Sequence, residues 1–200
     1  SGNGSNFQAV LDATLNAGLP LEIGALIVNN PNAFALTRAE RAGVASRVVV
    51  EWDRAVESRE AYDARLLHAV EQTRPQLVLL LGWMHLLSRP FVSHFSEMIN
   101  IHPAFLPLDQ TRDVVGMPDG ATIRAYRGAH AIQDALKDRS PWVGASAHRV
   151  SCDTDRGSVL VRKPLATGAQ EDEASIMNRL RPLEHQVLLG AIRRWLYERA

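Results

Sequence analysis

Residues 76–81 read Gln-Leu-Val-Leu-Leu-Leu and form the most strongly apolar run of the chain. A run of this length, preceded by Pro75, predicts a central strand that is covered on both faces. Shorter runs at 22–28, 48–50 and 99–103 also read as strands, and helical patterns separate them. Strands that alternate with helices at this spacing predict an α/β chain with a largely parallel sheet.

The second half of the chain is expected to add antiparallel strands. Residues 113–123 carry a Pro-Asp-Gly turn between two short extended runs, which is typical of a small hairpin. Residues 143–150 and 158–161 flank a polar loop and predict an antiparallel pair. Pro182 interrupts the last helical pattern, so we expect a kink or a new start there. Helices are predicted at 7–13, 33–42, 58–73, 88–95, 128–137 and 171–197.

The composition indicates one globular domain. Of 200 residues, 46% are hydrophobic and 22% are charged, so the chain can bury a core and is not intrinsically disordered. Lys plus Arg equals Asp plus Glu at 22 each, which argues against a surface that coats nucleic acid. The single cysteine, Cys152, excludes a disulfide framework and fits a reducing, cytoplasmic compartment. No apolar run reaches the ~20 residues of a membrane span, so no membrane partner is expected.

The chain opens with Ser1-Gly2-Asn3-Gly4-Ser5-Asn6, directly before a predicted helix. Glycines let the backbone approach an anion, and the first turn of a helix presents N–H groups at its positive end. No Gly-Lys-Ser/Thr follows, which excludes a Walker loop and suits a monophosphate. A glycine-rich turn without a ligand is the alternative. Because the segment reads as a strand-to-helix turn, we expect a further strand of about 6 to 8 residues before Ser1.

Asn100-Ile101-His102-Pro103 reads as the end of a strand. Side chains alternate along a strand, so Asn100 and His102 point to the same face. Open α/β sheets bind ligands at this end of their strands. A histidine that only satisfies a local hydrogen bond is the alternative. Asp155 lies in the polar loop 151–157, and no pattern in the sequence joins it to His102.

Several motifs together resemble the folate-dependent phosphoribosylglycinamide (GAR) formyltransferase family. They are Ser1–Ala9 (SGNGSNFQA), Ser58–Asp63 (SREAYD), Gly82–Val92 (GWMHLLSRPFV), Asn100–Pro107 (NIHPAFLP), Gly144–Val150 with Asp155 and Gly157, and Leu183-Glu184-His185. The resemblance implies the formyltransferase fold, a Rossmann-like, mostly parallel twisted sheet with helices on both faces and antiparallel strands in the C-terminal half. It covers residues 1–200 as a single domain.

The resemblance also implies a reaction and its catalytic residues. A formyl group would move from 10-formyltetrahydrofolate to the primary amine of GAR in purine biosynthesis, without a metal. Asn100 would donate to the formyl oxygen, His102 would transfer protons, and Asp155 would orient His102 and favour its charged form. Negative charge develops on oxygen in this transfer, and preorganised donors stabilise it.

Two sets of binding residues follow from the same resemblance. The GAR phosphate and ribose would be held by Gly4, Ser5, Asn6 and Glu184. The folate would be bound by Arg59, Met84, His85, Leu87, Val92, Met98 and the backbone around Cys152.

Three features depart from the family. His85 stands where an arginine is expected near the folate tail, and histidine supplies less charge at pH 7. Arg156 replaces a glycine after Asp155, so a positive φ there would require a different loop. Residues 108–127 form a longer link that would be a hairpin, a lid or an oligomer contact.

His148 is interpreted as a structural or surface side chain.

Two other functions compete with formyl transfer. A 10-formyltetrahydrofolate hydrolase would use the same Asn100, His102 and Asp155, although it needs no loop for a phosphate-bearing acceptor. A non-catalytic folate- or phosphate-binding homologue is suggested by His85, Arg156 and the longer link at 108–127. In each case the expected partners are small molecules, and the protein would be a monomer or a homodimer.

Overall fold

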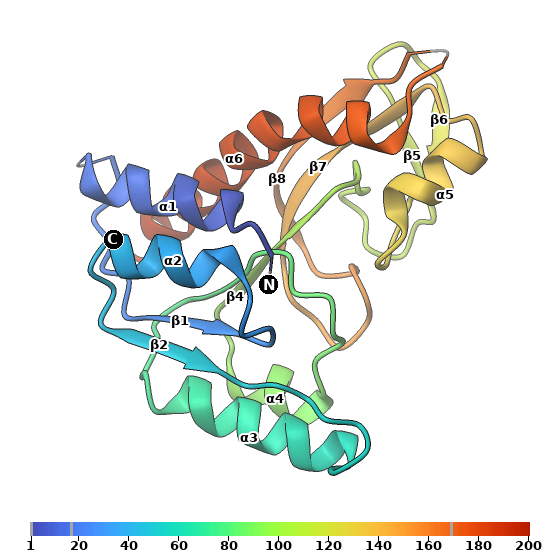
Figure 1. Ribbon diagram of the computed structural model, residues 1–200. Coiled ribbons are helices and arrows are strands. Elements are labelled where there is room, and N and C mark those ends of the chain that lie inside the picture. The colour runs from blue at the N-terminus through green and yellow to red at the C-terminus, as the bar shows by residue number, and fades with distance from the viewer. Residues whose placement is uncertain (1, 17, 169) are drawn as a thin grey trace. The chain divides into compact units, whose positions relative to one another are not determined.

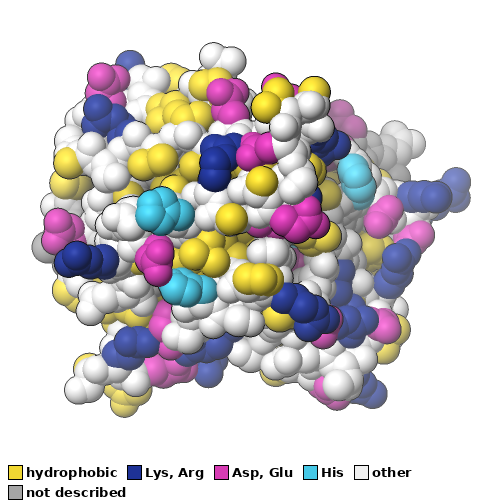
Figure 2. All heavy atoms as spheres, turned by 90° about the horizontal axis from the view of Figure 1, so that it is seen from below, with side chains coloured by type: hydrophobic (Ala, Val, Ile, Leu, Met, Phe, Trp, Pro, Cys, Tyr) yellow, Lys and Arg dark blue, Asp and Glu magenta, His cyan; other side chains and the backbone are white. Residues whose placement is uncertain are grey.

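The computed structural model describes residues 2–16, 18–168 and 170–200. The chain divides into two compact units, Ser1–Met98 and Ile99–Ala200. Ser1 itself and the strand expected before it lie outside the described residues. Lys and Arg side chains are interspersed with Asp and Glu side chains on the face shown in Figure 2, in line with their equal numbers in the sequence. Within the described ranges, no helix combines the length and the apolar character that a membrane crossing needs.

The first unit is built on a parallel pair of strands. β1 (Ala25–Val28) and β2 (Ser46–Val49) pair in register from Ala25 with Ser46 to Val28 with Val49. In Figure 1, α1 (Ser5–Leu15) and α2 (Phe34–Arg41) lie on one side of this pair, and α3 (Arg59–Glu71) and α4 (Arg89–His94) lie on the other. β3 (Val78–Leu80) is the third strand of this unit and lies within the apolar run at residues 76–81.

Serine caps fix where two of these helices begin. Ser58 Oγ accepts from the Ala61 N–H at 3.2 Å, and Ser88 Oγ accepts from the Phe91 N–H at 3.4 Å. Each cap satisfies an N–H group that has no partner inside the helix. The first turn of α3 therefore carries Arg59 at a fixed position.

The second unit is an antiparallel sheet covered by the last helix. β4 (Met98–His102) pairs with β7 (Trp142–Arg149), and β7 pairs with β8 (Val159–Ala166). α6 (Glu173–Tyr197) packs on β7 and β8, and α5 (Ala131–Lys137) packs on α6 and β7. The hairpin of β5 (Val114–Gly116) and β6 (Thr122–Arg124) lies within the link at 108–127.

The α/β class is confirmed, and the antiparallel pair predicted from 143–161 is present as β7 and β8. The expected new start at Pro182 is wrong, because α6 is one helix from Glu173 to Tyr197. Leu180, Val187 and Leu188 are fully buried on either side of the proline. Packing of this face against the sheet holds the two halves of the helix together despite the lost hydrogen bond.

Gly157 determines how the loop between β7 and β8 returns to the sheet. A Cβ placed on Gly157 would lie 1.6 Å from the carbonyl oxygen of Arg149. Next to this approach, the Arg149 N–H donates to the Ser158 carbonyl at 2.9 Å. Only glycine lets the two backbone segments come this close, and the loop between them carries Asp155.

We expect Gly157→Ala to lower the free energy of unfolding by about 1–3 kcal/mol, because the backbone must move to admit the methyl group. Gly116→Ala is the matched control, since nothing lies within 4 Å of a Cβ there, and its effect should stay within about 0.5 kcal/mol. Denaturant unfolding of both variants measures the difference. Equal unfolding free energies would contradict the close approach.

Candidate active site

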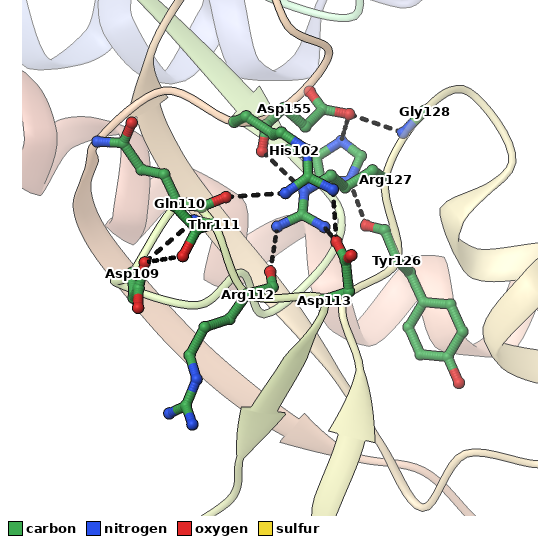
Figure 3. A network of polar contacts seen from close by, with 11 residues as sticks. His102, Asp109, Gln110, Thr111, Arg112, Asp113, Tyr126, Arg127, Gly128 and Asp155 are labelled. Atoms are coloured by element: carbon green, nitrogen blue, oxygen red, sulfur yellow. Dashed lines mark hydrogen bonds and ion pairs between the residues drawn. The ribbon is translucent and has the colours of Figure 1, made fainter.

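The carboxylate of Asp155 is the centre of a buried polar cluster. Its Oδ2 lies 3.5 Å from His102 Nδ1 and accepts from the Gly128 N–H at 2.7 Å (Figure 3). Its Oδ1 lies 3.3 Å from His148 Nε2 and accepts from Asn100 Nδ2 at 3.3 Å. The structure thus brings together Asn100, His102 and Asp155, which the sequence places on two separate segments.

Asp155 remains ionised across the physiological range. Burial raises the pKa of its carboxyl, but the hydrogen bond from His148, the charge of His102 and the Gly128 N–H outweigh it and lower the pKa to about 2. A carboxylate with this many donors is a fixed negative charge. It can therefore stabilise a proton on either histidine.

The ring of His102 is oriented by a hydrogen bond from Nε2, the nitrogen that does not face Asp155. Nε2 lies 2.8 Å from the carbonyl oxygen of Tyr126, which can only accept, so the proton of the neutral ring is on Nε2. Nδ1 is then the nitrogen that takes up a second proton, and it faces Asp155. Burial lowers the pKa of His102, and Asp155 and the Tyr126 carbonyl only partly offset this. The resting side chain is a neutral imidazole poised to accept a proton.

His148 is the residue that the sequence interpretation missed. It is 2% exposed, and the register of β4 and β7 places it directly opposite Asn100. Its Nδ1 lies 2.8 Å from the Arg149 carbonyl, which fixes a proton there. A neutral His148 accepts from Asn100 Nδ2 at 3.2 Å through Nε2, whereas a charged one donates to Asp155. The available signal was that His148 lies two residues after the buried Ser146, on a strand whose neighbouring positions Val143, Ala145 and Ala147 are apolar.

The loop around Asp155 differs from the sequence expectation. The left-handed residue is Asp155 itself, at φ 52°, and Arg156 does not share this conformation. Replacement of a glycine by Arg156 therefore causes no backbone strain at that position. Aspartate is among the residues that tolerate positive φ.

The proposed phosphate loop is held by a side chain that the sequence interpretation also missed. Gly4 caps α1 at φ 74°, where a Cβ would lie 2.8 Å from the Ala35 Cβ. Arg38 of α2 donates from Nε to the Asn3 carbonyl and from Nη2 to Asn3 Oδ1, each at 2.8 Å. Ser5 and Asn6 form the first turn of α1. An arginine beside a helix N-terminus adds positive charge where a phosphate would bind.

Arg59 and His85, two of the proposed folate residues, lie in one aromatic cluster. The His85 ring packs edge-on against Trp52, Tyr62 and Trp83 at centroid distances of 5.8, 5.8 and 5.9 Å. Arg59 stacks over Trp52 at 5.0 Å and bonds Asp63 Oδ1 at 2.9 Å. Burial lowers the pKa of His85, and the charges of Arg59 and Arg54 lower it further. The cations of this cluster are therefore arginines, Arg59 and also Arg54, which packs over Trp52 at 4.5 Å, rather than His85.

The remaining proposed residues differ in how accessible they are. Met84 is exposed, Leu87 and Val92 are half-buried, and Met98 is buried. Cys152 is an exposed free thiol in the Asp155 loop. Glu184 is a buried carboxyl on α6, at 6% exposure. Across the described residues, no group of three or more His, Cys, Asp or Glu side chains is arranged to hold a metal ion.

Comparisons with known proteins give the same family as the sequence motifs. The family model described as "Formyl transferase" matches residues 1–192. Phosphoribosylglycinamide formyltransferase of Escherichia coli (strain K12) is 34% identical over 188 residues, which are 94% of this chain and 80% of that protein. The trifunctional purine biosynthetic protein adenosine-3 of Drosophila melanogaster is also 34% identical over 188 residues, and this chain spans 12% of its length.

A solved structure supports the relationship. Glycinamide ribonucleotide transformylase 1 from Symbiobacterium toebii superimposes with a TM-score of 0.82 at 28% identity, over 96% of this chain and 82% of that one. The resemblance inferred from the motifs is thereby confirmed, and the chain belongs to the formyl transferase family.

Proposed function

We propose that this protein transfers the formyl group of 10-formyltetrahydrofolate to the primary amine of GAR, in the cytoplasm, as a monomer or a homodimer. The observation that carries the proposal is the Asp155 carboxylate, held among Asn100, His102 and His148 in a buried cluster. The relative from Escherichia coli, at 34% identity, supports the choice of substrates.

The first step is attack of the GAR amine on the formyl carbon. The attacking nitrogen becomes positively charged and must lose a proton. His102, held neutral by burial, accepts it at Nδ1, and Asp155 stabilises the imidazolium that forms. Proton transfer thus produces a positive charge 3.5 Å from a fixed negative charge, so little reorganisation is needed to stabilise it.

The formyl oxygen becomes an oxyanion in the same step. Asn100 is the neutral donor for it, through the Nδ2 that rests at 3.3 Å from Asp155 and 3.2 Å from His148. These contacts are long for hydrogen bonds, so a stronger acceptor displaces them at little cost. His102, once charged, returns its proton to the departing folate nitrogen.

The binding residues divide between the two substrates. Gly4, Ser5 and Asn6, steadied by Arg38, are proposed to hold the GAR phosphate, and Glu184 to hold the ribose hydroxyls. Arg59 is proposed to bind the anionic end of the folate beside His85. The surrounding folate residues would be Met84, Leu87, Val92, Met98 and the backbone at Cys152.

Turnover of 10-formyltetrahydrofolate with and without GAR tests the proposed function. We expect turnover that requires GAR and yields formyl-GAR, because the loop at residues 4–6 is proposed to bring the GAR amine, rather than a water molecule, to the formyl carbon as the nucleophile. The measurement is the absorbance change of the folate, with formate assayed in parallel. Formate release without GAR would identify a hydrolase, and no turnover at all would indicate a binding protein.

The pH dependence of kcat/KM tests the role of His102. Since the neutral imidazole is the base, activity should fall as the pH drops through its pKa, with a midpoint below the ordinary histidine value of about 6.5. Asp155→Asn should move this midpoint to still lower pH, because Asp155 raises the pKa of His102. His102→Ala should lower kcat by about 10²–10⁴. The control is His68→Ala on the exposed face of α3, and equal rates for both alanine variants would exclude the role.

The double variant Ser5→Ala, Asn6→Ala tests the phosphate loop. Loss of hydrogen bonds to a charged phosphate should weaken GAR binding by at least about tenfold, with little change in kcat. Thr37→Ala on α2 is the control. Calorimetric titration with GAR measures the affinity. An affinity equal to that of the control would place the phosphate elsewhere.

A further inference from the structure

Three consecutive residues, Tyr126 to Gly128, contact two of the ionisable groups of the candidate site, His102 and Asp155. The Tyr126 carbonyl accepts from His102 Nε2 at 2.8 Å, and the Gly128 N–H donates to Asp155 Oδ2 at 2.7 Å. Between them, Arg127 Nε donates to the backbone carbonyl of Asp155 at 3.2 Å (Figure 3). The position of this segment therefore sets the distance between His102 and Asp155.

The side chain of Arg127 is itself fixed by the link at 108–127. Nη1 bonds Asp113 Oδ1 at 2.8 Å, and Nη2 donates to the Arg112 carbonyl at 2.8 Å. The Arg127 side chain is 13% exposed. A planar guanidinium with each of its nitrogens engaged has one orientation, which a lysine cannot reproduce.

Arg156 contacts the same segment from the Asp155 side. Its Nη1 donates to the Gln110 carbonyl at 2.9 Å, and its Nη2 bonds Asp113 Oδ1. Asp113 thus joins Arg127 and Arg156, and its carbonyl accepts from the Ala125 N–H at 2.8 Å to close the base of the hairpin. The longer link and the arginine after Asp155, both departures from the family pattern, contact each other.

We propose that Arg127 and Asp113 are positioning residues that hold the Asp155 loop against β4, the strand that carries Asn100 and His102. The link at 108–127 would therefore contribute to turnover. The role in turnover rests on the proposed function. Asp155 is in the left-handed region, a conformation that surrounding contacts must maintain. Arg127 on its carbonyl and Gly128 on its carboxylate supply these contacts from one short segment.

We expect Arg127 and Asp113 to affect the turnover rate more than the free energy of unfolding. Asp113 is 68% exposed, and exposed ion pairs add little to the free energy of folding. A small displacement of a catalytic group, in contrast, costs up to about 100-fold in rate. Variants that fold normally but turn over slowly are the expected signature.

The test compares Arg127→Met, Arg127→Lys, Asp113→Asn and the combination of Arg127→Met with Asp113→Asn. Arg194→Met is the matched control, because Arg194 forms an exposed pair with Glu198 on α6, outside the link. We expect kcat to fall about 10- to 100-fold in Arg127→Met and Arg127→Lys, less in Asp113→Asn, with KM for GAR nearly unchanged. The double variant should be less impaired than the product of the two single effects, since both changes remove the Arg127–Asp113 pair, while Asp113→Asn alone also weakens the pair with Arg156.

A second readout does not depend on turnover. In Asp113→Asn the Asp155 carboxylate should lie farther from His102, so the pKa of His102, followed by NMR in the free protein, should fall below its wild-type value. Thermal unfolding shows that each variant is folded. Rates within about twofold of the control, effects that multiply in the double variant, or an unchanged His102 titration would each overturn the proposal. If the wild-type protein shows no GAR-dependent turnover, the proposed function fails, and the NMR comparison still decides the positioning role.

Discussion

The buried carboxylate of Asp155 is the interaction on which the candidate site depends. A lone charge in this position would be too costly to bury, and its pKa would rise. Donors from β4, β7 and the segment before α5 instead lower the pKa to about 2. The carboxylate holds each of these donors in place, and the donors in turn hold the carboxylate. The site is consequently a single network rather than a set of independent side chains.

This network requires an unusual backbone path. Asp155 takes a positive φ, and Gly157 passes so close to Arg149 that no side chain fits. The loop from β7 to β8 therefore turns back sharply and delivers the carboxylate to the face of β4 that carries Asn100 and His102. Backbone strain of this kind persists where surrounding contacts maintain it. Here Arg127 contacts the backbone carbonyl of Asp155, and Gly128 contacts its carboxylate.

Local patterns in the sequence predict much of the second unit but not how its loops meet. Alternation predicts that Asn100 and His102 share a face, and turn residues predict the hairpin at 113–123. The position of His148 depends on the register of β7 against β4, and that of Arg127 on the path of a link with no repeating pattern. Of the kink or new start expected at Pro182, the new start is wrong, because burial along α6 outweighs the lost hydrogen bond.

The balanced charge of the chain gives the local donors a larger role. Equal numbers of acidic and basic residues provide no broad field to attract two anionic substrates. Each proposed anion site in the first unit instead has its own arginine, Arg38 at the glycine-rich loop and Arg59 in the aromatic cluster. Because burial and the charges of Arg59 and Arg54 lower the pKa of His85, charge recognition in that cluster rests on these arginines rather than on His85. Substrate affinity should accordingly depend on particular contacts far more than on ionic strength at long range.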